Sequence, residues 1–167
     1  MDNPDFKDML SALNDAGAEF IVVGAHALAA HGLVRATGEL DLWVRADKGN
    51  AVRVAAAFEA FGGASLSVFD VTIEDLSVPG VGVAIGAEPN RIDLHTRILG
   101  VTFEEAWESA IEATMFGEAI RVLSHGGLVR AKRASMERRP EGSPKRAQDA
   151  ADLAWLESLG PKKPTTR

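Results

Sequence analysis

The sequence predicts an α/β (α+β) fold, in which a short mixed β-sheet is backed by helices and followed by a C-terminal helical segment. Short apolar runs rich in β-branched residues, which are typical of strands, recur between longer segments whose apolar residues lie three and four positions apart, as in helices. The chain has 167 residues, of which 46% are hydrophobic, and this is enough to build the core of one globular domain.

Charge and cysteine content restrict the partners of the protein. The 18 basic and 24 acidic residues give a net charge of -6, so a polyanionic partner has to be bound locally rather than by the whole surface. The absence of cysteine excludes disulfides, thiolate metal sites and cysteine nucleophiles. No signal-peptide pattern and no apolar run of about 20 residues is present. We therefore expect a soluble cytoplasmic protein without a membrane partner.

The first predicted elements are a helix, a strand and a second helix. Asn3 and Pro4 provide an N-cap and a first helical residue, and Gly17 lies where that helix should end. The run "EFIVVG" (19–24) predicts a buried strand that ends at a glycine, and "AHALAAHG" (25–32) predicts a short helix.

A second strand, "ELDLWV" (39–44), precedes a helix over 50–63. The residues expected on the core face of this helix are Val52, Ala55, Ala56, Phe58 and Phe61. Residues 67–80 fit neither periodicity clearly. The runs 81–86 and 91–98 flank a turn and predict an antiparallel pair.

The last third of the sequence predicts a capped helix, a hairpin and two helices. Thr102 and Glu105 form a capping box, and Gly117 lies at the centre of the hairpin. Two helices, 124–139 and 143–159, both start at serine. The predicted organisation is a core over 1–123, a helical segment over 124–159 and a flexible tail over 160–167.

Two carboxylates interrupt the apolar strand 39–44. Side chains alternate between the faces of a strand, so Glu39 and Asp41 lie side by side, while Leu40 and Leu42 point into the core. A divalent cation between the two acids would turn their repulsion into attraction. Oxygen ligands favour Mg²⁺, with Mn²⁺ as the alternative ion. The competing interpretation is the solvent face of an edge strand, where acids are ordinary.

Asp93 is a third acid inside an apolar strand. If strand 91–98 is a neighbour of strand 39–44, the three acids form a cluster on one exposed edge of the sheet. Such a cluster can hold two metal ions, and the third acid can take the proton from a nucleophile. The alternative is an ordinary residue at the end of a strand.

The turn at Gly24 and Ala25 lies between a strand and a helix. Backbone N–H groups at a helix N-terminus can meet phosphate oxygens, although one glycine turn is a weak signal by itself. The acid pair follows Gly24 by fifteen to seventeen positions, and the combination is more specific than either part.

The stretch "FIVVGAHALAAHGLVRATGELDLWV" resembles the signature of the DNA polymerase β-like nucleotidyltransferase superfamily. It is most similar to the small bacterial branch that includes minimal nucleotidyltransferases and abortive-infection toxins. In that signature an apolar strand is followed by Gly with Gly or Ser, a short helix, and Asp or Glu, an apolar residue and Asp. The runs 91–107 and 128–156 resemble the family's third-carboxylate and C-terminal helical segments, so the resemblance covers roughly 19–159.

The resemblance implies a nucleotidyltransferase fold and transfer of a nucleoside monophosphate from a metal-bound nucleoside triphosphate to a hydroxyl. It implies metal binding by Glu39, Asp41 and Asp93. It also implies a substrate-facing lysine at Lys132 and supports the approach of Gly24 and Ala25 to phosphate. With Arg35 and Thr37, which precede the acids, these are the predicted nucleotide-binding residues. The implied acceptor is an RNA end or a partner protein, and the implied context is a toxin–antitoxin pair, in which the protein has a cognate antitoxin or toxin.

Two residues depart from the family pattern. Ala25 replaces the second glycine or serine and removes any hydroxyl that would touch phosphate, and Glu39 replaces the usual aspartate with a longer side chain. An ion with strict octahedral geometry is sensitive to such a change. The alternative function is a catalytically degenerate module that binds a nucleotide or a partner.

Other candidate residues have competing interpretations. Arg35 and Thr37 either meet the triphosphate and orient the acids, or are simply exposed by a loop. His26 and His31 do not have the spacing of a helical zinc pair, so we expect capping or surface roles, whereas His95 shares the face of Asp93. The basic cluster at Arg130, Lys132, Arg133, Arg138 and Arg139 is either a substrate-facing surface or a solvated helix face. Asp149 and Asp152 are its expected ion-pair partners.

Overall fold

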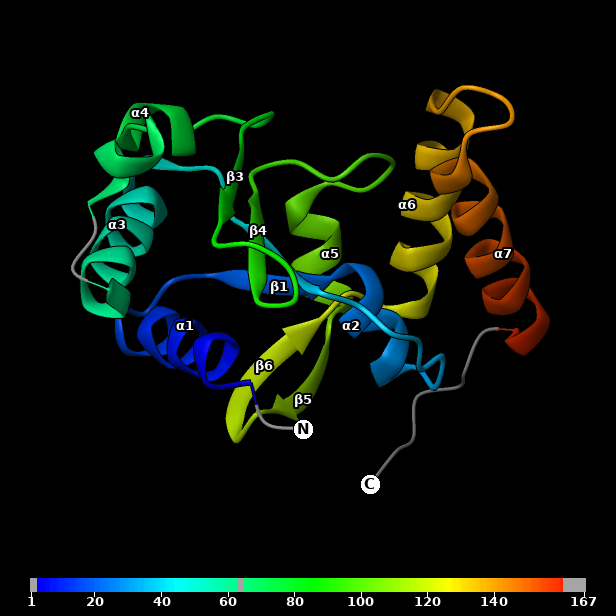
Figure 1. Cartoon of the computed structure of the whole chain (residues 1–167), viewed down its shortest axis with the longest axis horizontal. Helices are drawn as coiled ribbons and strands as arrows, with labels where there is room; N and C mark the ends of the chain where they lie inside the picture. The colour runs from blue at the N-terminus through cyan, green and yellow to red at the C-terminus, as the bar shows by residue number, and fades with distance from the viewer. Residues whose placement is uncertain (1–2, 63–64, 161–167) are drawn as a thin grey trace.

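A computed structural model of the chain describes residues 3–62 and 65–160, in which six strands form one sheet that is covered by helices (Figure 1). The strands are β1 (Phe20–Val23), β2 (Glu39–Val44), β3 (Gly82–Ile85), β4 (Arg91–His95), β5 (Ile111–Met115) and β6 (Glu118–Val122). The α-helices are α1 (Pro4–Asp15), α2 (Gly24–Ala30), α3 (Lys48–Gly62), α4 (Ile73–Leu76), α5 (Phe103–Ser109), α6 (His125–Arg138) and α7 (Pro144–Leu159). A 3₁₀ turn covers Leu66–Phe69.

The sheet is mixed and has the strand order β3-β4-β2-β1-β6-β5. β1 pairs with β2, β3 with β4, and β5 with β6 in antiparallel fashion, whereas β2 with β4 and β1 with β6 are parallel. The predicted α/β class, the pairing of strands 81–86 and 91–98, and the hairpin around Gly117 are therefore confirmed.

The helix ends follow the capping signals of the sequence. The Asn3 side chain accepts a hydrogen bond from the Phe6 N–H, and Thr102 and Glu105 form a reciprocal capping box. Ser124 and Ser143 cap α6 and α7. Each cap satisfies a backbone N–H group that the first turn of a helix leaves without a partner.

The core face of α3 differs from the prediction. Val52 is 49% exposed and Ala56 is exposed, whereas Ala51 and Val54 are fully buried. The reason is Asn50, whose buried side chain bonds to the backbone of Glu19 and Arg45. These bonds hold the face that contains Asn50 against the residues just before β1 and just after β2, and an apolar pattern cannot predict this because the anchoring residue is polar.

The carboxylates do not lie at an edge of the sheet. β2 lies between β4 and β1, because the β3–β4 hairpin adds two strands outside it. The expected exposed edge is therefore wrong, and so is the alternative interpretation of β2 as an edge strand. The expected inward direction of Leu40 and Leu42 is confirmed, since both are fully buried.

The C-terminal helices α6 and α7 pack against each other at the side of the molecule away from α3 and α4 (Figure 1). Leu128, Ala131 and Leu156 from these helices belong to the same apolar core as the sheet. The boundary between 1–123 and 124–159 stays a prediction. Of the predicted tail, residues 161–167 lie outside the described part of the chain. Within the described residues, no helix is long and apolar enough to cross a membrane.

Candidate functional site

Two neighbouring parallel strands bring three carboxylates together. Asp41 of β2 lies directly opposite Asp93 of β4, and Glu39 is two residues before Asp41 on the same face. One oxygen from each carboxylate lies within 4.8 Å of the other two. The side chains of Asp41 and Asp93 are 22% and 13% exposed, so the cluster is open to a ligand but partly shielded from water.

Position 24 needs a glycine because the carboxylate of Asp41 lies where a side chain would be. The φ of Gly24 is +65°, and a Cβ atom at this position would lie 2.2 Å from Asp41 Oδ2. The turn between β1 and α2 therefore passes directly against the carboxylate, and the neighbouring Ala25 is buried. The glycine turn and the acid pair, which the sequence analysis treats as two signals, form one packed unit.

Arg91 lies within the carboxylate cluster. Its Nε donates to Asp93 Oδ1 at 2.9 Å and its Nη2 donates to Asp93 Oδ2 at 2.6 Å, while Nη2 is also 3.1 Å from Glu39 Oε2. The hydrogen bond to Asp93 raises the pKa of Arg91. No sequence motif singles out Arg91, although its position two before Asp93 places it on the same face of the strand.

Burial raises the pKa of Glu39 above its usual value. Arg91 opposes this rise, whereas the negative charges of Asp41 and Asp93 add to it. His95 lies on the side of the cluster opposite to Glu39, with Nε2 3.2 Å from Asp41 Oδ1. The ionised form of Glu39 is thus less favoured in the protein alone than it is for a free glutamate in water, and a cation bound beside it would favour that form.

The other histidines near the site have structural roles. The imidazole of His26 packs edge-on against Phe6 and lies near Phe116, and burial lowers its pKa against the opposing effect of Asp41. His31 is the C-cap residue of α2, and its Nε2 is 2.9 Å from the Leu123 carbonyl oxygen. The capping role expected for His31 is confirmed, but its side chain is buried.

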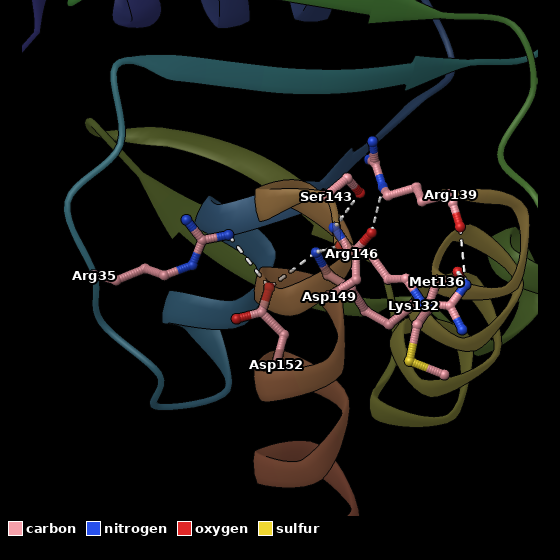
Figure 2. A network of polar contacts seen from close by, with 8 residues as sticks. All are labelled: Arg35, Lys132, Met136, Arg139, Ser143, Arg146, Asp149 and Asp152. Atoms are coloured by element: carbon pink, nitrogen blue, oxygen red, sulfur yellow. Dashed lines mark hydrogen bonds and ion pairs between the residues drawn. The ribbon is translucent and has the colours of Figure 1, made fainter. Parts of the chain in front are cut away.

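Lys132 lies at the centre of an ionic network between α6 and α7 (Figure 2). Its Nζ is 2.9 Å from both Asp149 Oδ1 and Asp152 Oδ2, and both carboxylates are buried. Arg139 Nε donates to Asp149 at 2.6 Å, and Arg35 Nη2 donates to Asp152 at 3.3 Å. The expected pairing of Asp149 and Asp152 with the basic cluster is confirmed.

The same region holds the end of α6 in place. Arg146 Nη1 donates to the Met136 and Arg139 carbonyl oxygens at 2.9 and 2.8 Å, and Ser143 caps the helix that carries Arg146 (Figure 2). These bonds satisfy carbonyl groups that the end of a helix leaves free. Arg146 therefore fixes the connection between the two helices.

The loop before β2 contacts both the acids and the helical segment. Thr37 Oγ1 donates to the Glu39 carbonyl oxygen and accepts from the Glu39 N–H, each at 3.2 Å, so it holds the backbone of Glu39 and not its carboxylate. Arg35, two residues earlier, binds Asp152 of α7. This loop thus connects the start of β2 to the helix that carries Asp152.

A cleft of about 420 Å³ separates the carboxylate cluster from α6 and α7. All eight residues predicted for the site line it: Gly24, Ala25, Arg35, Thr37, Glu39, Asp41, Asp93 and Lys132. Its volume is within the range of small-molecule sites. A second cavity, of about 540 Å³, lies against β5 and β6, but its charged lining residues, Glu112 and Arg121, lie 3.9 Å from each other and include no acid cluster. The chemistry therefore points to the cleft beside the three carboxylates.

The oxygen donors of the cluster fit a hard divalent ion. Three carboxylates with oxygens within 4.8 Å of one another can converge on one ion, and no softer ligand is present among them. Glu39, Asp41 and Asp93 would hold such an ion. The bound ion would supply Lewis-acid chemistry at a phosphate.

Comparison with solved structures finds an antigenic nucleotidyltransferase-like protein from Paracoccidioides brasiliensis. It is 18% identical to this chain, with a TM-score of 0.53, and the match covers 96% of this chain and 78% of that one. Known protein families and curated proteins yield no match. The predicted membership of the small bacterial branch thus stays a prediction, whereas the fold is shown: the chain has a nucleotidyltransferase-like fold.

Proposed function

We propose that the protein is a divalent-metal-dependent nucleotidyltransferase, which transfers a nucleoside monophosphate from a nucleoside triphosphate to a hydroxyl and releases pyrophosphate. One observation carries the proposal: the carboxylates of Glu39, Asp41 and Asp93 converge on a cleft of about 420 Å³ in a nucleotidyltransferase-like fold. Metal-bound carboxylates that face a phosphate are the usual requirement of phosphoryl-transfer chemistry.

The proposed roles follow the positions of the residues around the cleft. Asp41 and Glu39 bind the metal, and Asp93 completes the metal site and takes the proton from the acceptor hydroxyl. Gly24 and Ala25 line the wall that the triphosphate approaches. Lys132 is already bound to two carboxylates, so the positive charge that it offers to phosphate is that of the whole network, in which the three cations Arg35, Lys132 and Arg139 face two carboxylates.

The proposed acceptor is an RNA end or a partner protein, and the proposed biological context is a toxin–antitoxin pair. Both rest on the resemblance of the motif around Gly24, Glu39 and Asp41. A gene for a small helical partner next to the gene for this chain would support the pair.

The function is tested by incubating the protein with Mg²⁺ and each α-labelled nucleoside triphosphate, together with total RNA and cell protein. We expect label in one acceptor fraction with the wild type and none with Asp41→Asn, because this change removes a metal ligand without changing the shape of the side chain. Asp8→Asn, at an exposed residue of α1, is the matched control and should retain the activity.

The degenerate binding module makes a different prediction. In that case nucleotide binds measurably, but no label appears in RNA or protein with either wild type or Asp41→Asn. Binding without transfer for all four nucleotides, with Mg²⁺ and with Mn²⁺, would reject the enzyme in favour of the module.

A further inference from the structure

Arg91 occupies a position within the carboxylate cluster that is fixed by the sheet. It lies in β4 directly opposite Glu39 in the parallel register, and alternation places it on the same face as Asp93. Its backbone N–H donates to the Gly38 carbonyl oxygen at 3.1 Å, so the residue is held at the start of a paired strand and not in a mobile loop. The side chain is 31% exposed.

The Arg91 guanidinium already pairs with two of the three carboxylates, Asp93 and Glu39. Both oxygens of Asp93 accept hydrogen bonds from it, in the paired geometry that gives arginine its strongest contacts with carboxylates. Glu39 Oε2 is a further contact at 3.1 Å. Asp41 pairs with His95, whereas the ion pairs of Arg91 are with Asp93 and Glu39, so Asp41 and the second oxygen of Glu39 stay available for a further cation.

An arginine differs from a metal ion because its charge is permanent. Its guanidinium does not lose its proton in a protein, so the positive charge stays in the cluster at every pH at which the protein is folded. Three carboxylates carry three negative charges, and one guanidinium with one divalent ion matches them. A second divalent ion would have to bind beside the guanidinium with no carboxylate charge left to neutralise.

We propose that Arg91 takes the place of one of the two divalent ions that a three-carboxylate cluster can hold, so that the site binds a single ion. Asp41 and Glu39 hold this ion, and Asp93 completes the site with the lone pairs that Arg91 leaves free. This deepens the proposed function, on which it rests, because it assigns to a protein side chain the charge that a second metal would supply. Arg91 is a positioning residue for Asp93 and Glu39.

The number of bound ions tests the proposal without any measurement of activity. Purified protein without nucleotide is titrated with Mn²⁺, and the free ion is measured by electron paramagnetic resonance. We expect one ion per chain for the wild type. We expect two for Arg91→Gln, with the first ion bound about tenfold more tightly, because removing one like charge beside a divalent ion has about this effect even at the dielectric constant of water.

Two further variants control for charge and folding. Arg97→Gln removes the same charge from an exposed residue just after β4 and should keep one ion at the wild-type affinity. Arg91→Lys keeps the charge without the paired hydrogen bonds and should also bind one ion. Circular dichroism establishes that each variant is folded before titration.

Three results overturn the proposal: two ions in the wild type, one ion of unchanged affinity in folded Arg91→Gln, or no Mn²⁺ binding by the wild type. The first result leaves the proposed transferase intact, with two metals. One ion in the wild type without label transfer to any acceptor has the opposite meaning, because the inference then stands and the proposed function fails. No Mn²⁺ binding by the wild type overturns this inference and removes the metal from the proposed function.

Discussion

Gly24 and Asp41 show at the scale of single residues how a backbone turn and a catalytic candidate depend on each other. The glycine has a positive φ that other residues rarely adopt, and the space of its missing Cβ is taken by the carboxylate of Asp41. A side chain at this position would both strain the turn and displace the acid.

Gly24→Ala should therefore destabilise the protein more than the same substitution at a glycine where only the backbone is strained and no side chain is in the way. We expect a loss of about 2–4 kcal/mol in the free energy of unfolding, from backbone strain of about 1 kcal/mol and overpacking of about 1–3 kcal/mol. Urea denaturation provides the measurement. Gly142→Ala is the matched control, since Gly142 has a φ of +76° and nothing within 4 Å of its Cβ position. Equal losses in the two variants would show that Asp41 does not depend on Gly24.

Among the elements, α5 has an N-terminus whose stability depends on pH. Glu105 accepts hydrogen bonds from the N–H of Thr102, from the Arg130 side chain and from the Thr102 hydroxyl, and these bonds, in that order of effect, lower its pKa below the ordinary value of 4.5. The unfolded chain thus binds more protons than the folded chain in this region of pH, and the stability due to Glu105 increases with pH. The contribution is present above pH 4.5 and is lost as the pH falls below it.

Glu105→Gln should remove this part of the pH dependence. We expect the urea midpoint of the variant to fall less than that of the wild type between about pH 6 and about pH 3, because glutamine has no proton to gain. Glu108→Gln removes one charge from an exposed residue of the same helix and is the control. Identical pH profiles for wild type and Glu105→Gln would contradict the assignment of the capping box as the cause.

Across the whole molecule, the ionic network around Lys132 joins segments that are far apart in sequence. Arg35 in the loop before β2, Lys132 and Arg139 in and after α6, and Asp149 and Asp152 in α7 are all connected by ion pairs (Figure 2). The carboxylates of Asp149 and Asp152 are only 7% and 1% exposed. Their charges are therefore stable in the fold only while the cations remain beside them.

Lys132→Met should destabilise the protein by about 3–5 kcal/mol, since it leaves buried carboxylates with fewer partners. Arg133→Met is the control on the next residue of α6, where the ion pair with Glu157 is half exposed on both sides, and should cost about 0–1 kcal/mol. Thermal unfolding without nucleotide measures both effects and separates them from any role of Lys132 in phosphate binding. Losses below 1 kcal/mol in both variants would mean that water reaches the network.

The sequence predicts the elements well where local signals are strong. The bounds of β2 agree with the structure, and the capping residues Asn3, Thr102, Ser124 and Ser143 start their helices as expected, because a cap depends only on residues within one turn. The predicted core face of α3 is right for Phe58 and, in part, for Ala55 and Phe61, but wrong for Val52 and Ala56. Asn50 anchors that helix through contacts with Glu19, 31 positions away in the chain.

The sequence also predicts the candidate site only in part. The spacing of Glu39 and Asp41 places them on one face of a strand. Asp93 is a candidate because it is a third acid inside an apolar strand, and the resemblance to nucleotidyltransferases supports it as their partner. That Arg91 binds two of these acids depends on the parallel register of β2 and β4, and this register is set by the whole sheet.

By itself, the sequence determined the short-range features of this protein: where its helices begin, which strand carries the acid pair, and that a glycine turn precedes it. Only the tertiary structure decided that Gly24 makes room for Asp41, that Arg91 lies among the acids, and that Lys132 is bound between two buried aspartates. The physical reason is the distance along the chain over which each interaction acts. Capping and alternation act within a few residues, whereas the distances between charges, and so their pairing, are fixed only when strands and helices from distant parts of the chain pack together.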